Sequence, residues 1–378
     1  MKKKCILDLC DTPQNAGTGA MGYSIHTIDF RVSLTEKDRV GIEERLITLS
    51  RQYHARYFSK KEGMGYCSIR YLVAQKFGFN YVSVVKGTSK DGFTKLWMDI
   101  KLNPRWMFHE DSYPFTYIAS PDELLRGYER IQEFLDAANI TVIDCRMFVV
   151  HRIDYCVNID MGDRALVKTY MRLMRKGCCP YKMKRKVEYS ESGHRQVLTK
   201  DSFTVFSKTA EFAIYDKCTQ LEKEGEKYHE EDLQAAEGMI CIELRVKRIK
   251  VRYDAKAHGC EDTRSQLEMA SEIASKNIPR YLESAYGRGK FVKYEKAKQL
   301  IRKSRYRKKT KEMLLDFLQM VSSQDLEKAK ESYEKDFKEC MKRFNELGIS
   351  PITIEKGSKV KEMENPLYYI EHRGKNYE

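Results

Sequence analysis

Apolar and polar residues alternate along several short stretches of the chain, and this period of two is typical of β-strands with one buried face. The most regular run covers residues 148–159, and an earlier one covers residues 25–34. Similar runs predict further strands at residues 65–72, 79–86, 93–102 and 239–251. Within residues 202–217, two short predicted strands flank a polar turn at Ser207, Lys208 and Thr209.

Other stretches carry apolar residues three or four positions apart, the spacing of a helix with one buried side. One helix is predicted at residues 36–53, with Thr35 as its N-cap. A second begins after Ser120, where Pro121 and Glu123 complete the residues of a capping box. A third follows Asp163. From about residue 256 onward the pattern is mainly helical and highly charged.

The mixture of strands, hairpins and helices up to about residue 251 predicts an α+β fold. We expect mainly antiparallel sheets covered by helices, followed by a helical C-terminal region. The predicted divisions are a flexible leader at 1–22, an N-terminal α+β domain at 23–145, a second α+β domain at 146–255, a helical basic domain at 256–350 and a tail at 351–378.

Composition adds a class of partner. The 378 residues carry a net charge of +14 and a pI near 9.1, which favours a polyanionic partner, with nucleic acid first and a membrane surface second. No run approaches the roughly 20 apolar residues of a membrane helix. Asp8 and Asp11 interrupt the apolar N-terminal stretch, which argues against a signal peptide. We therefore expect a cytoplasmic protein without a membrane partner.

Three predicted strands present unusual polar residues on one face: Asp154, then Tyr215 with Lys217, then Glu243 with Arg245. Each has an ordinary alternative. A lone aspartate is usually solvated or hydrogen-bonded, any one of 24 tyrosines is rarely a nucleophile, and the last pair suits a cross-strand charge ladder. Only if the strands are neighbours in one sheet do these groups converge, and the sequence leaves that adjacency open.

Together, such groups suit transfer of a phosphodiester to tyrosine. Carboxylates bind Mg²⁺ or Mn²⁺, and such an ion polarises a scissile phosphate. A tyrosine hydroxyl ionises only near pH 10 unless a cation such as Lys217 stabilises the phenolate. Arg152 or Arg245 would hold the phosphate oxygens.

At these positions the sequence resembles a known family. Arg152-Ile153-Asp154, Tyr215-x-Lys217 and Glu243-x-Arg245 are similar, in order and spacing, to motifs of rolling-circle replication initiators. The similar proteins are those of the filamentous-phage gene II/X type and the plasmid Rep_trans type. The segment at 100–108, IKLNPRWMF, also resembles part of the gene II family. The resemblance covers about residues 25–255.

The resemblance implies a relaxase-like fold and a DNA strand transferase, or site-specific endonuclease, with 146–255 as its catalytic domain. Tyr215 would attack origin DNA and keep its 5′ phosphate as a phosphotyrosine intermediate, with help from Lys217. Asp154 and Glu243 would be the metal ligands and Glu211 a weaker third. The wider relaxase superfamily uses a histidine pair. This chain has no such pair among its eight histidines, which favours carboxylate ligands.

The expected partner is origin DNA, single-stranded or in an extruded hairpin, and the resemblance also implies a helicase and a single-strand DNA-binding protein. A homodimer, the identity of the metal, and a plasmid, phage or integrated-element context are left open. Two runner-up functions remain. One is a non-catalytic DNA-binding replication or copy-control protein, and the other is a conjugative mobilisation relaxase.

Two basic segments, at 172–186 and 290–311, are candidates for binding DNA phosphates, although each also suits a solvated helix face. The predicted DNA-binding residues are Lys182, Lys184, Arg185, Arg302, Arg305 and Arg307.

Overall fold

The structure is a computed structural model of the whole chain. It describes residues 19–20, 22–52, 57–59, 66–69, 77–88, 92–104, 107, 118–189, 196–197, 202–224 and 230–372. The strand predicted at 65–72 and the segment at 100–108 therefore lie partly outside the described residues.

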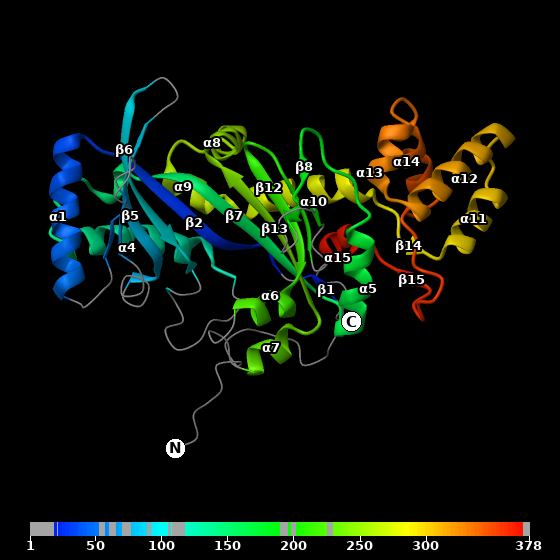
Figure 1. Ribbon diagram of the computed structural model, residues 1–378, viewed down its shortest axis with the longest axis horizontal. Helices are drawn as coiled ribbons and strands as arrows, with labels where there is room; N and C mark the ends of the chain where they lie inside the picture. Colours follow the sequence, from blue (N-terminus) through cyan, green and yellow to red (C-terminus); the bar gives the residue numbers. More distant parts are fainter. Residues whose placement is uncertain are drawn as a thin grey trace, which may run out of the picture.

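One antiparallel sheet of 11 strands forms the centre of the fold (Figure 1). The strand order is β3-β4-β5-β6-β2-β7-β13-β12-β11-β8, and β1 pairs with the end of β7. The strands are β1 (Gly19–Ala20), β2 (Ser24–Ser33), β3 (Tyr57–Ser59), β4 (Tyr66–Ile69), β5 (Phe79–Thr88), β6 (Thr94–Leu102), β7 (Val149–Asp160), β8 (Lys184–Arg185), β11 (Ser202–Phe206), β12 (Ala210–Asp216) and β13 (Met239–Lys247). Two small two-stranded sheets pair β9 (Glu188–Tyr189) with β10 (Gln196–Val197) and β14 (Phe291–Val292) with β15 (Glu362–Met363).

Helices accompany the sheet and make up most of the chain after β13. The longer ones are α1 (Glu36–Gln52), α4 (Pro121–Ala137), α5 (Arg164–Met174), α8 (Arg248–Ala257), α10 (Ala270–Tyr286), α11 (Tyr294–Lys303), α12 (Lys308–Ser323) and α14 (Phe337–Glu346). The shorter ones are α6 (Lys217–Glu224), α7 (Glu230–Ala236), α9 (Thr263–Glu268), α13 (Leu326–Ser332), α15 (Pro366–Glu371) and the 3₁₀ turn η2 (Cys145–Met147). This architecture confirms the predicted α+β class with a helical C-terminal region.

One face of the sheet is apolar and forms the core. Ile153, Tyr155 and Val157 of β7 are fully buried, as are Ile242 and Leu244 of β13. Helix α10 packs across β2, β7 and β13, α5 covers β11 to β13, and α1 covers β4 to β6. Figure 1 shows α1 at one end of the molecule and α11, α12 and α14 at the other. The opposite face of the central strands is therefore left to polar residues.

The N-cap residues predicted from the sequence for two helices are confirmed. Ser120 caps α4 with the complete capping box, and Asp163 caps α5 by accepting a hydrogen bond from the Leu166 amide. Within the described residues, no helix is long and apolar enough to cross a membrane.

Two predicted strand ends were wrong. The strand containing Tyr215 ends at Asp216, so Lys217 begins α6 and does not share the strand face. The reason is local, because the Asp216 carboxylate accepts hydrogen bonds from the amide and hydroxyl of Thr219, as an N-cap does. The strand predicted at 239–251 ends at Lys247, and the alternation beyond it belongs to α8.

The predicted domain divisions stay a prediction. Strands on both sides of the expected boundary at 145 and 146 belong to one sheet, since β2 pairs with β7. Beyond residue 350, Ile352, Ile354 and Ile370 are buried in the same core cluster as the sheet.

Gly289 marks a close approach of two chain segments. A Cβ at this position would lie 2.2 Å from the backbone carbonyl carbon of Ile349, beside the parallel bridge from Lys290 to Ile349. We expect Gly289→Ala to lower the free energy of unfolding by about 3 kcal/mol, measured by urea denaturation. Gly41→Ala in α1, where a Cβ meets nothing within 4 Å, should instead add about 0.5–1 kcal/mol. Equal effects of the two changes would contradict the close approach.

Candidate active site on the polar face of the sheet

The three strands that carry the candidate residues are neighbours in the order β7-β13-β12. Their register brings the polar residues into rows that cross the strands. The rows are Asp154–Arg245–Glu211, Cys156–Glu243–Ala213 and Asn158–Cys241–Tyr215. Because alternate residues share a face, all nine lie on the side of the sheet opposite the core. We call this side the polar face.

Arg245 joins two of the predicted metal ligands. Its guanidinium donates to Glu211 Oε1 at 2.7 Å through Nη1 and to Glu243 Oε2 at 2.5 Å through Nη2. The other oxygen of Glu243 lies 3.0 Å from Nδ1 of His26. Burial by itself raises the pKa of Glu243, but the hydrogen bonds and charges of His26 and Arg245 outweigh it and hold that pKa well below its usual range. Glu243 is therefore a buried, ionised carboxylate.

Asp154 forms a second, separate cluster. Arg152 binds its carboxylate in bidentate fashion, at 2.7 Å to Oδ1 and 2.8 Å to Oδ2, and the Thr27 hydroxyl donates to Oδ2 at 2.6 Å. Asp154 is 2% exposed. Asp154 and Tyr215 are four residues apart along the strands and two strands apart across the sheet. Their backbones are therefore separated by about 13 Å in the first direction and about 10 Å in the second. The face is thus shared, but Asp154 and Tyr215 are not in contact.

Tyr215 lies one row from Glu243 on the neighbouring strand, with their Cα atoms about 7–8 Å apart. The side chain clusters with Cys156, Ala213 and Cys241, and 9% of the residue is exposed. Its hydroxyl has no hydrogen-bond partner within the part of the chain that is described. Burial, with Cys241 and Glu243 nearby, raises the pKa of Tyr215 well above 10. In this arrangement the phenol is protonated at neutral pH.

Lys217 is close to Tyr215 but is not aimed at its hydroxyl. Its ammonium lies 5.9 Å from the centroid of the Tyr215 ring and donates to Oε1 of Gln220 at 2.9 Å. The residue is 2% exposed. The expectation that Lys217 lowers the pKa of Tyr215 therefore stays a prediction, and burial is the larger influence on Tyr215.

A cavity of about 200 Å³ opens beside Tyr215, and we call it the Tyr215 cavity. Glu211 and Arg245 line it together with Tyr215. Lys186, an exposed residue, and Lys223 add two further cations to its wall. The cavity is large enough for a phosphate group, and cations outnumber carboxylates around it.

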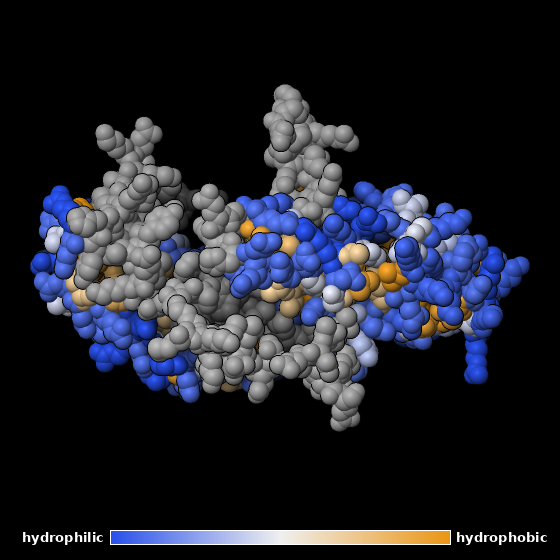
Figure 2. Space-filling model, turned by 90° about the horizontal axis from the view of Figure 1, so that it is seen from below, coloured by the Kyte–Doolittle hydropathy of each residue, from blue (hydrophilic) through white to orange (hydrophobic). Residues whose placement is uncertain are grey.

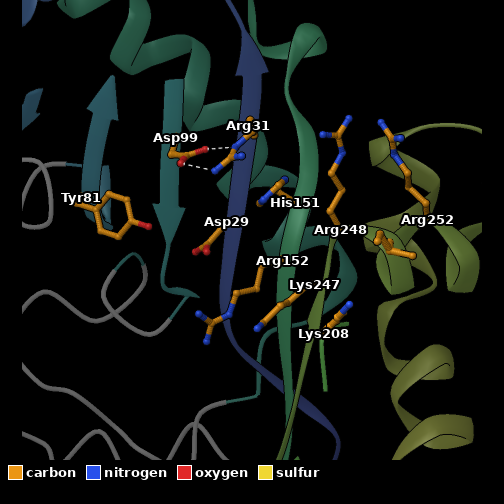
Figure 3. A pocket seen from close by; sticks show the side chains of 11 residues that line it. Asp29, Arg31, Tyr81, Asp99, His151, Arg152, Lys208, Lys247, Arg248 and Arg252 are labelled. Carbon is orange, nitrogen blue, oxygen red and sulfur yellow. Dashed lines mark hydrogen bonds and ion pairs between the residues drawn. The ribbon is translucent and has the colours of Figure 1, made fainter. Parts of the chain in front are cut away.

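A larger pocket of about 750 Å³ lies at the other end of the polar face (Figure 3). We call it the basic pocket. Its lining residues are Asp29, Arg31, Tyr81, Asp99, His151, Arg152, Lys208, Lys247, Arg248, Ile249 and Arg252. Six cations thus face two carboxylates, and one of these, Asp99, is bound by Arg31 at 2.6 and 2.7 Å. Burial and the guanidinium of Arg31 lower the pKa of His151 to about 4, so its ring is neutral.

The predicted metal ligands do not fit a metal ion in this arrangement. Both oxygens of Asp154 and both of Glu243 are occupied by arginine, threonine or histidine. In the described ranges, no group of three or more histidine, cysteine, aspartate or glutamate residues is arranged to hold a metal. A divalent ion would have to displace Arg245 from Glu243 and Glu211.

The predicted DNA-binding residues fall into two kinds. Lys182 and Lys184 are exposed, but Arg185 is engaged inside the protein, where it binds the carbonyl of Gly177 at 2.5 Å and lies over the Phe203 ring. Arg302, Arg305 and Arg307 are exposed around the turn between α11 and α12, at the end of the molecule opposite α1 (Figure 1).

Several residues of the polar face were missed from the sequence. His26 reaches Glu243 because the pairing of β2 with β7 is irregular between Ile25 and Thr27. Nothing in the sequence signals that irregularity. The basic pocket was missed because Lys208, Lys247 and the α8 arginines come from separate segments.

Comparisons with known proteins add little to this geometry. No protein-family model and no curated protein matches the chain. A solved structure described as a rolling circle replication initiator protein from Geobacillus stearothermophilus aligns with 90% of this chain and 100% of its own. The TM-score is 0.30 and the identity 11%. A TM-score of this size does not establish a common fold, so any function must follow from the residues of this chain.

Proposed function

We propose that this protein is a rolling-circle replication initiator that nicks and rejoins DNA through Tyr215. The observation that carries the proposal is the position of Tyr215. It lines a phosphate-sized cavity with Arg245, on the sheet face that continues to the basic pocket. A tyrosine in the apolar core would have no such access.

In the proposed reaction, the phenol oxygen of Tyr215 attacks a backbone phosphorus. The bond from phosphorus to the 3′ oxygen breaks, the phenol proton leaves with the 3′ hydroxyl, and the 5′ phosphate stays on the tyrosine. Arg245, which lines the same cavity and is held by Glu211 and Glu243, would bind the non-bridging oxygens together with Lys186 and Lys223. Since burial keeps Tyr215 protonated, ionisation has to accompany DNA binding.

The dependence on Mg²⁺ or Mn²⁺ stays a prediction, and no step above passes through a metal ion. The test incubates the protein with single strands covering inverted repeats beside its gene, in Mg²⁺, in Mn²⁺ and in a chelator. A DNA-protein adduct that survives denaturation supports the proposal, and its loss in chelator supports a metal requirement. Equal adduct in all three conditions would remove that requirement.

The non-catalytic alternative is favoured by one observation, the buried and protonated state of Tyr215. It predicts tight binding of the same DNA with no adduct under any of the three conditions. Mobilisation in conjugation would use the same chemistry, and the DNA beside the gene distinguishes it.

The turn between α11 and α12 gives a separate prediction. Replacing Arg302, Arg305 and Arg307 together by glutamine should flatten the salt dependence of single-strand binding. Each phosphate contact contributes about 0.7 to the slope of log affinity against log salt, so the slope should fall by about 2. Fluorescence anisotropy over a salt series measures it, and an unchanged slope would assign these arginines to a solvated surface.

A further inference from the structure

Helix α8 presents two kinds of side chain to solvent beside the basic pocket. Arg248 and Arg252, four residues apart, line the pocket and are exposed. The next positions along the same helix, Ile249 and Tyr253, are large and apolar, yet they are 70% and 69% exposed. Exposed aromatic and apolar groups next to cations are typical of surfaces on which unpaired bases stack while phosphates are neutralised.

Four cations of the basic pocket lack a carboxylate partner within the described part of the chain. Among the described residues, Lys208, Lys247, Arg248 and Arg252 make no ion pair. Partial burial and repulsion from Arg252 and Arg31 lower the pKa of Arg248. Figure 3 shows Lys247, Arg248 and Arg252 on the α8 side of the Arg31–Asp99 pair. An incoming polyanion would relieve this repulsion.

The first turn of α8 adds to the same site. Its N-cap residue, Lys247, makes no side-chain capping hydrogen bond, and Arg248 and Ile249 of that turn line the pocket. Uncapped amides at a helix N-terminus attract phosphate oxygens.

The basic pocket and the Tyr215 cavity lie on the same polar face of the sheet. Lys247 is paired with Arg152 on β7, and Glu243 lies four residues earlier on β13, about 13 Å along the strand. On the same face, Phe206 of β11 is 41% exposed opposite Glu211. A strand bound at α8 would therefore cross about four residues of β13 to reach the row of Glu243, next to that of Tyr215.

We infer that the basic pocket and the exposed side of α8 bind a single-stranded segment of polynucleotide. Phosphates lie against Lys247, Arg248 and Arg252, and a base stacks on Tyr253. The inference rests on the proposed function only for its extension, that the bound strand is DNA and continues to the Tyr215 cavity. A single strand fits better than a duplex, because the exposed rings need unpaired bases.

The test measures anisotropy of a labelled oligothymidylate of about 20 nucleotides, which has no base pairing. The protein carries Tyr215→Phe, so binding is measured without any chemistry. Arg248→Gln with Arg252→Gln should reduce the salt slope by about 1.4, two contacts at 0.7 each. Tyr253→Ala should weaken binding by about tenfold, and Tyr253→Phe should restore it. The inference would be overturned if the double arginine variant left the salt slope unchanged and Tyr253→Ala left the affinity unchanged.

The matched control is Lys338→Gln with Lys342→Gln on α14, two exposed cations also four residues apart on a helix remote from α8 (Figure 1). This control variant should have a slope of log affinity against log salt within about 0.3 of that of the Tyr215→Phe protein. A duplex of equal length should bind more weakly than the single strand. Equal binding, or displacement by polyglutamate as effective as by unlabelled oligothymidylate, would overturn the assignment to a single strand.

The two proposals fail separately. A covalent adduct formed by the wild-type protein, together with an unchanged salt slope in the α8 variant, would refute the pocket and keep the nicking activity. If the α8 variant has a smaller salt slope but the wild-type protein forms no adduct, the pocket is supported and nicking is refuted. Figure 2, a view at right angles to Figure 1, shows hydrophilic residues dominating the coloured surface at both ends of the molecule, so a hydrophilic surface alone does not distinguish α8.

Discussion

Tyr215→Phe is expected to abolish the covalent DNA adduct while leaving folding and DNA binding nearly unchanged. The substitution removes one oxygen, the proposed nucleophile, and keeps the ring that packs with Cys156 and Cys241. The lost hydroxyl makes no hydrogen bond with the described residues, so its removal should change the free energy of unfolding by less than about 1 kcal/mol. A denaturing gel with labelled DNA reads the adduct, and thermal unfolding reads the stability.

The matched control is Tyr155→Phe. Tyr155 is also buried and also lacks a hydrogen-bond partner among the described residues, but it lies on the core face of β7. This variant should keep the adduct at the wild-type yield. If Tyr215→Phe gives as much adduct as Tyr155→Phe, another group is the nucleophile. If both lose it, the loss reflects packing of the sheet.

The elements of the sheet were largely predictable from the sequence, because alternation within β7 and β13 is a local property. Ile153, Tyr155 and Val157 face the core, and Asp154 faces away, as the period of two requires. Which strands are neighbours was not predictable, since pairing depends on contacts between distant segments. The polar alternation of β13 alone does not reveal that Glu243 lies beside β7 and β12.

The hydrogen-bond and ion-pair partners of the candidate residues were less predictable than the strand face on which these residues lie. Carboxylates on a polar strand face suggest metal ligands, but in the structure each of them already has a basic partner. Arg152 of the same strand binds Asp154, Arg245 of the neighbouring strand binds Glu211, and His26 of β2 and Arg245 of the same strand bind Glu243. Arg245 was predicted to hold phosphate, and its present partners are Glu211 and Glu243. Similarly, the position of Lys217 depended on where β12 ends, which the Asp216 cap decides.

The second prediction with a large expected effect follows from the pairing of Arg245 with Glu243. Arg245→Met is expected to lower the free energy of unfolding at pH 7 by about 3–5 kcal/mol, the usual cost of leaving a buried charge without its partner. Glu243 is 1% exposed and would retain only His26. Urea denaturation measures the loss. Adding Glu243→Gln to Arg245→Met removes the stranded charge and should recover much of the stability, whereas no recovery would assign the loss to packing.

The pH dependence of this loss of stability distinguishes the charge of the Arg245 guanidinium from its packing. In the wild-type protein the pKa of Glu243 is held below its unfolded value near 4.5, so its ionised form stabilises the fold above that pH, and this stability is lost as the pH falls. In Arg245→Met, only His26 opposes the effect of burial, so the pKa of Glu243 rises from its wild-type value and its ionised form stabilises the fold less. The deficit of the variant should therefore be largest near pH 7 and shrink as the pH falls towards and below about 4.5. A deficit of equal size at pH 7 and pH 4 would show that the guanidinium acts by packing rather than by neutralising Glu243.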